Sequence, residues 1–139
     1  MGYELAVVGL GNTSRQDRGI GIYLLDSLQD RFSKYPIKFI NGGVDGRDLF
    51  NLLQQLTVKK VIVLDTVEKI ESPGSLNYLT MALDQAGRLE KLMIITIEVF
   101  ETDWGSELSF PLVKKYKEIS TEIESVIEQM LTRPLRINP

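Results

Sequence analysis

Three carboxylates stand where short segments of the chain end or turn, and they are the residues best placed to do chemistry. Asp65 and Glu98 each follow an apolar run, and Asp17 follows a glycine-containing loop. The sequence contains no Cys and no His, which removes thiolate nucleophiles, cysteine metal sites and the usual general base near neutral pH. Any chemistry must therefore depend on carboxylates, hydroxyls, Lys, Arg and backbone groups.

Asp65 has two interpretations at this stage. A carboxylate at the end of a buried strand is costly unless it is paired or coordinated, so we expect Asp65 to have a partner. That partner is either a bound cation, or the Arg18 guanidinium or a helix N-terminus. Asp17 has a simpler interpretation as the N-cap of the helix that follows it.

The first turn supplies backbone groups that could hold a ligand. Gly9, Gly11 and Asn12 follow the apolar run 5–8, and glycine lets the backbone turn sharply and approach a neighbour closely. A dinucleotide-binding fingerprint needs a further glycine where Ser14 stands, and an acidic residue where Asn41-Gly42-Gly43 ends the second apolar run. The match to a dinucleotide site is therefore weak.

Strand-like and helix-like segments alternate along the chain. We predict strands over 5–8, 37–40, 61–64 and 92–97, and an edge or antiparallel strand over 76–79 after a turn at 72–75. We predict helices over 18–32, from Asp45-Gly46 onward and over 111–131. Residues 81–90 are expected to form a weak helix or a loop. This order predicts one domain over residues 1–139. Its fold would be a three-layer α/β sandwich, a mostly parallel sheet with helices on both faces.

The predicted topology brings the candidate residues together. The carboxyl ends of parallel strands share one edge of a sheet, and ligands bind in the crevice there. We therefore expect Gly9 to Asn12, Gly42-Gly43, Asp65 and Glu98 to surround one site, with Asp17 within reach of it.

Composition excludes some partners. The formal charge of −3 and the lack of a basic cluster argue against nucleic acid. No apolar run approaches the ~18 residues of a membrane span, and no export signal is visible, so we expect a cytoplasmic protein that does not bind membranes. The apolar stripe on 111–131 predicts a helix docked on the sheet rather than a coiled coil, which favours a monomer or a weak homodimer.

The motifs, taken in order, resemble the hydrogenase maturation endopeptidases. The shared segments are GLGN (9–12), Asp17 with Gly19 and Gly21, GGVDGRDL (42–49), VIVLDTV (61–67), SPGSL (72–76) and a carboxyl-terminal part with Glu98, a Trp-containing loop and a long helix. The resemblance implies an α/β sandwich and a cytoplasmic hydrolase. Its activity would be a protease that removes a carboxyl-terminal extension from the large-subunit precursor of nickel–iron hydrogenases. Nickel would then be held in the substrate rather than tightly by this chain.

The resemblance also implies site residues. Of three expected nickel contacts, Asp65 matches the one that ends the central strand; Arg18 stands in place of the first, and the third is a His, which this sequence lacks. We expect Arg18 to repel nickel and to pair with Asp65. The implied catalytic residues are Asp65 and Asp17, with Glu98 and Glu101 as further carboxylates.

Two alternatives stay open. One is a non-catalytic relative that binds the precursor without cutting it. The other is a small-molecule or nucleotide-binding α/β module on the same scaffold, because fold does not fix function.

Overall fold

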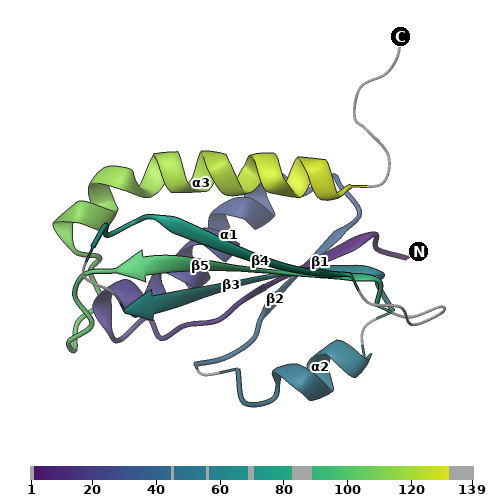
Figure 1. Ribbon diagram of the computed structural model, residues 1–139, viewed down its shortest axis with the longest axis horizontal. Helices are drawn as coiled ribbons and strands as arrows, with labels where there is room; N and C mark the ends of the chain where they lie inside the picture. The colour runs from purple at the N-terminus through teal and green to yellow at the C-terminus, as the bar shows by residue number, and fades with distance from the viewer. Residues whose placement is uncertain (1, 45, 56, 69–70, 83–88, 132–139) are drawn as a thin grey trace, which may run out of the picture.

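A computed structural model describes residues 2–44, 46–55, 57–68, 71–82 and 89–131, and a five-stranded sheet forms its middle layer (Figure 1). The spatial order of the strands is β2-β1-β3-β5-β4. Their bounds are β1 Leu5–Gly9, β2 Ile37–Asn41, β3 Lys60–Glu68, β4 Leu76–Ala82 and β5 Lys91–Val99. Only β4 runs antiparallel to its neighbour among these strands. The mostly parallel sheet and its antiparallel edge strand are thus confirmed.

Helices cover both faces of the sheet, which confirms the three-layer sandwich. A 3₁₀ turn, η1 (Gln16–Gly19), leads into α1 (Ile20–Arg31), and α1 lies with α3 (Phe110–Met130) on one face, while α2 (Leu49–Gln55) lies on the other (Figure 1). The second helix begins later than expected, at Leu49. Asp45 lies outside the described residues.

Both faces of the central strands are buried, as the continuous apolar runs predicted. Leu5 and Val7 pack into the core under α1 and α3, whereas Ala6 and Val8 belong to the core on the α2 face. The predicted stripe of α3 packs into the first of these cores with the following residues: Leu112, Ile119, Ile123 and Ile127. Among the described residues, no helix combines the length and the apolar character needed to cross a membrane.

The two strands that carry the candidate carboxylates are longer than predicted. β1 ends where Gly9 lies opposite Leu64, but β3 continues to Glu68 alongside β5. Asp65 is therefore the first residue of β3 beyond the end of β1, and it lies inside a strand rather than at its end. β3 continues because β5 still supplies a hydrogen-bonding neighbour on its other side.

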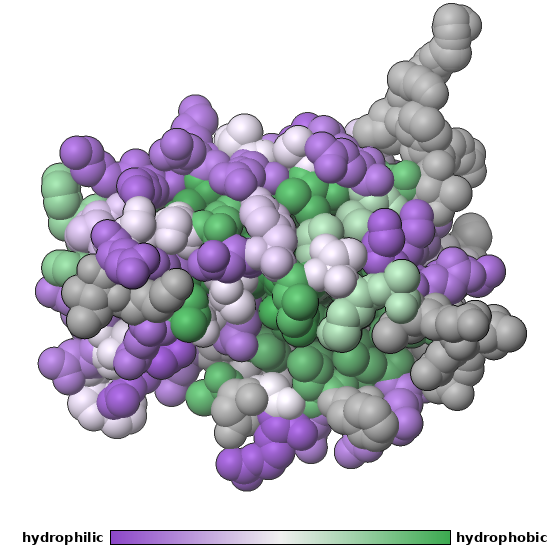
Figure 2. Space-filling model, in the orientation of Figure 1, coloured by the Kyte–Doolittle hydropathy of each residue, from purple (hydrophilic) through white to green (hydrophobic). Residues whose placement is uncertain are grey.

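Apolar side chains are exposed along one edge of the sheet. On β4, Leu79 is 56% exposed and Met81 is 36% exposed. Figure 2 shows green, apolar surface at mid-height on this face, below the hydrophilic side chains that cover α3. The predicted loop or weak helix at 81–90 is corrected in part, because residues 81 and 82 belong to β4; residues 83–88 lie outside the described part.

Candidate functional site

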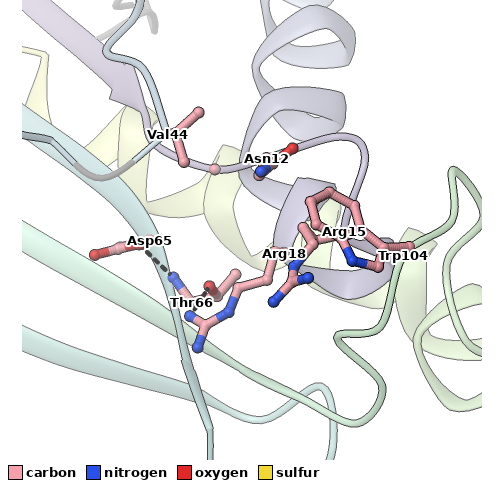
Figure 3. Close-up of a pocket in the computed structure, with 8 residues that line it drawn as sticks. Asn12, Arg15, Arg18, Val44, Asp65, Thr66 and Trp104 are labelled. Atoms are coloured by element: carbon pink, nitrogen blue, oxygen red, sulfur yellow. Dashed lines mark hydrogen bonds between the residues drawn. The ribbon is translucent and has the colours of Figure 1, made fainter.

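A cavity of about 550 Å³ lies beside the carboxyl end of β1 (Figure 3). The first loop supplies Gly11, Asn12, Arg15 and Arg18, and β3 supplies Asp65 and Thr66; Val44 and Trp104 complete the lining. The structure thus brings Gly11, Asn12 and Asp65 together, as predicted. Gly9, Gly42 and Gly43 do not line the cavity.

The predicted glycines that do not line the cavity form backbone hydrogen bonds that hold the first loop in place. The Gly42 N–H donates to the Gly9 carbonyl at 2.8 Å, and the Gly11 N–H donates to the Gly43 carbonyl at 3.0 Å. Gly21 allows α1 to pack tightly against this loop, because a Cβ at that position would lie 2.5 Å from the Leu10 carbonyl oxygen. These glycines therefore shape the scaffold of the site.

Asp65 presents a half-buried carboxylate to the cavity. Its Oδ1 accepts a hydrogen bond from the Thr66 N–H at 2.8 Å. Within the described part of the chain it has no ion pair, so the expected pairing with Arg18 is wrong. Arg18 instead donates from Nη1 to Thr66 Oγ1 at 2.9 Å, and its Nη2 lies 3.0 Å from Glu68 Oε2.

Strand alternation explains this choice of partners. Successive side chains of a strand point to opposite faces. Thr66 and Glu68 share a face of β3 with Leu64, which belongs to the core beneath α1. Asp65 shares the opposite face with Val63, which belongs to the core on the α2 side. Arg18 comes from the turn before α1, so it reaches the residues on its own face. Arg18 and Asp65 therefore meet the cavity from different sides of β3.

Asp17 is fully buried and does not line the cavity. Its Oδ2 accepts hydrogen bonds from the N–H groups of Phe100 and Glu101 and from Ser109 Oγ, and its Oδ1 accepts one from the Ser109 N–H, all at 2.7 to 2.9 Å. The predicted N-cap role is wrong, because α1 has Gly19 at its N-cap and no side-chain cap. Asp17 instead fixes the loop before α3 against the first loop.

Glu98 is also buried and lies outside the lining of the cavity, so its predicted place in the site is wrong. Its Oε2 accepts hydrogen bonds from the N–H groups of Glu71 and Ser72, and Ser75 Oγ lies 3.3 Å from its Oε1. The turn that follows β3 thus supplies the partners of this carboxylate. Glu101 contributes its backbone: its carbonyl oxygen accepts from the Asp17 N–H at 3.0 Å.

Four lining residues were missed by sequence reasoning: Val44, Thr66, Arg15 and Trp104. The Arg15 guanidinium stacks on the Trp104 ring, 4.3 Å from its centroid, and Trp104 is 72% exposed. Backbone bonds join their loops, since the Gln16 N–H donates to the Gly105 carbonyl at 2.7 Å. The only signal in the sequence was a lone Trp in a polar, glycine-containing loop after β5.

The donor chemistry of the cavity does not fit a resident metal ion. Among the described residues its lining contains one carboxylate, and Arg18 stands where the family resemblance implies a second acid. Across the residues that the structure describes, no group of three or more His, Cys, Asp or Glu side chains could hold a metal ion. In the described part of the lining, the nickel contact implied for Asp65 therefore has no second carboxylate beside it.

Comparisons with known proteins agree with this fold. A family model described as hydrogenase maturation protease (HycI) matches residues 22–83. The chain is 34% identical over 77 residues to the coenzyme F420 hydrogenase subunit delta of Methanothermobacter thermautotrophicus, a match that covers 52% of this chain and 49% of that protein. The match thus spans about half the length of this curated relative.

Solved structures resemble the chain over most of its length. The hydrogenase maturating endopeptidase HybD from E. coli has a TM-score of 0.74 at 15% identity and covers 91% of this chain and 93% of that one. The protease HybD from Thermococcus kodakarensis has a TM-score of 0.70 at 17% identity, covering 88% and 98%. The fold is therefore that of the solved hydrogenase maturation proteases. By its fold, and by the family model over residues 22–83, the chain is similar to the hydrogenase maturation proteases.

The match to the family model is uneven across the site. Residues 22–83 include Val44, Asp65 and Thr66 but exclude Arg15, Arg18 and Trp104. The match to the family model thus includes the lining residues of β3, whereas the two arginines and Trp104 lie in parts of the chain outside that match.

Proposed function

We propose that this chain acts on the large-subunit precursor of a nickel–iron hydrogenase and removes its carboxyl-terminal extension. The match to the family model and the hydrogenase subunit among the relatives support a hydrogenase partner. Nickel belongs to the precursor in this proposal, and the reaction takes place in the cytoplasm, as the family resemblance implies. The chain acts as a monomer or a weak homodimer.

The observation that carries the proposal is the carboxylate of Asp65. It lines a cavity large enough for a peptide segment, and one of its oxygens is fixed by the Thr66 N–H. Without an ion pair among the described residues, this carboxylate is available to a ligand. Of the two residues predicted to be catalytic, Asp65 lines the cavity and Asp17 does not.

Peptide hydrolysis assigns Asp65 the role of general base. Its carboxylate takes a proton from a water molecule whose oxygen bonds to the carbonyl carbon of the scissile peptide. The carbon–nitrogen bond then breaks, and the proton passes from Asp65 to the departing amine nitrogen. The side chains of Asn12 and Arg18 lie in the same cavity and can donate to the carbonyl oxygen as negative charge develops on it.

A second candidate is binding without cleavage. Arg18 in place of an acid, and a sequence without His, remove two contacts that the family resemblance implies for nickel. A chain of this kind would hold the precursor at the same cavity and leave its length unchanged. The third candidate, a small-molecule or nucleotide-binding module, uses the cavity for a ligand that is not a protein.

The intact mass of the precursor separates these candidates. The nickel-loaded precursor from the organism that encodes this chain is incubated with wild type, with Asp65→Asn, and with Asp30→Asn as a matched control on the exposed side of α1. We expect wild type and the control to remove a carboxyl-terminal segment, and Asp65→Asn to slow this removal by roughly 100-fold or more.

Other outcomes reject proteolysis. An unchanged precursor that co-elutes with wild type on size exclusion supports the binding candidate. A precursor that is neither shortened nor bound rejects a precursor partner altogether, and equal cleavage by Asp65→Asn rejects the assignment of the general base.

A further inference from the structure

Two arginines line the cavity from a single turn of the backbone. The Arg18 N–H donates to the Arg15 carbonyl at 3.0 Å, and the 3₁₀ turn Gln16–Gly19 begins between them. Residues three apart in such a turn project to the same side. The sequence thus places two permanent positive charges at one wall of the site.

The charges of the two arginines are balanced to different degrees. Arg18 is paired with Glu68, whose side chain is 60% exposed. Within the described ranges Arg15 has no ion pair, and its guanidinium contacts the Trp104 ring. The ring covers one face of the guanidinium, and the N–H groups at its rim stay available as donors.

The arrangement suits a carboxylate better than a metal cation. A guanidinium presents donors in a planar fork that matches the two oxygens of a carboxylate. Asn12 lies in the same cavity, and because its Oδ1 accepts from the Ser14 N–H at 2.9 Å, its amide N–H groups are free to donate. Among the described residues of the lining, a metal ion would find one carboxylate and two guanidiniums, too few oxygen ligands for a stable site.

We propose that Arg15, with Arg18 and Asn12, binds a carboxylate group of a peptide in this cavity, and that the cavity does not bind a free divalent cation. The proposal rests on the proposed function for the source of the peptide, which is the precursor. The carboxylate is either an acidic side chain or the terminal carboxylate of the chain.

The position of Asp65 sets the direction of the bound peptide. Figure 3 shows Arg15 with Trp104 on one side of the cavity and Asp65 on the other, with Arg18 and Thr66 between them. Asp65 repels a second negative charge, so the carboxylate binds at the Arg15 end. The rest of the peptide then extends toward Asp65, where the reaction is proposed.

The single tryptophan of the chain reports on this site directly, because Trp104 lines it. Tryptophan fluorescence is recorded while untagged protein is titrated with three acetylated peptides that lack aromatic residues. The first has one Glu and an amidated end, the second has Gln in its place, and the third has Gln with a free terminal carboxylate. Calorimetry of the same peptides provides a readout that does not depend on the ring.

We expect at least one carboxylate peptide to bind saturably and the neutral peptide not to bind. Comparison of the first and third peptides identifies the source of the carboxylate. Arg15→Gln should weaken binding by roughly 10- to 100-fold, as expected for loss of a charged hydrogen-bonding partner. Arg15→Lys should recover part of this loss. Arg31→Gln is the matched control, because Arg31 also stacks on an aromatic ring, that of Phe32, but does not line the cavity.

The inference would be overturned by equal binding of the neutral peptide, by binding that Arg15→Gln leaves unchanged, or by saturable binding of nickel chloride that Asp65→Asn abolishes. Inorganic phosphate is titrated in parallel, and binding of phosphate with failure of both carboxylate peptides also rejects it. Carboxylate binding without any effect on the precursor rejects the proposed function and retains the inference. A processed precursor with no peptide binding retains the proposed function and rejects the inference.

Discussion

Replacing Asp17 by Asn tests whether one buried carboxylate joins the two loops of the site. In wild type its oxygens accept four hydrogen bonds, from the N–H groups of Phe100, Glu101 and Ser109 and from the Ser109 hydroxyl. Asn has the same shape but one acceptor oxygen. With that oxygen at the Oδ2 position, three of the four bonds can form, and the amide N–H groups then face the Ser109 N–H.

The cost follows from this donor count. One charge-assisted bond is lost, worth about 1.5–3 kcal/mol, and the Ser109 N–H is left buried without an acceptor, at about 1–3 kcal/mol. The total is about 2.5–6 kcal/mol in the free energy of unfolding. For a chain of 139 residues this corresponds to a fall in Tm of roughly 9–21 °C.

Urea unfolding followed by circular dichroism measures this loss, with Asp103→Asn as the control. Asp103 is exposed in the same loop and contacts Gln16 through its backbone N–H, so its side-chain change should cost less than about 0.5 kcal/mol. Hydrogen exchange at the Ser109 amide should also accelerate in Asp17→Asn, because this N–H loses its acceptor. Equal stability of the two variants would refute the reasoning.

Three further predictions concern the scaffold. Gly21→Ala should destabilise by about 1–3 kcal/mol, because its Cβ would lie 2.5 Å from a backbone oxygen of the first loop, whereas Gly2→Ala, with open space around it, should be neutral in the same thermal unfolding assay. Ile123→Ala should cost about 2–5 kcal/mol in urea unfolding, since this α3 side chain is fully buried. Burial and the hydrogen bond to Glu122 raise the pKa of Tyr78, so the folded state favours the neutral phenol. The stability it contributes is complete below its unfolded pKa, near 10, and is lost as pH rises above it, so Tyr78→Phe should flatten the loss of stability between pH 9 and 11.

The fold could be predicted because it depends on patterns within single segments. Apolar β-branched runs such as 61–64 are typical of strands buried on both faces, and the stripe on α3 is the side that packs on the sheet. The antiparallel edge was predicted from the alternation at 76–79. Such patterns need no knowledge of what lies across the sheet.

The partners of the carboxylates could not be predicted in the same way. The carboxylate of Asp17 accepts hydrogen bonds from backbone N–H groups up to 92 residues away. Every residue type except proline carries a backbone N–H, so the sequence does not indicate which one will be the donor. The pairing of Arg18 with Glu68 could have been predicted only if β3 were known to continue past Asp65, since residues 66 and 68 then share a face. Arg15 was missed because its partner, Trp104, lies on a loop that only the fold brings to it.

The burial of Asp17 has a consequence for the order in which the chain is made. All four of its hydrogen-bond donors lie between residues 100 and 109, so a ribosome-bound chain that ends near β5 can form most of the sheet while this carboxylate still lacks them. The loop that carries Trp104 gains its last two bonds to Asp17 only when Ser109 has been synthesised. The cavity is thus completed after its scaffold, and a partially synthesised chain lacks the finished site.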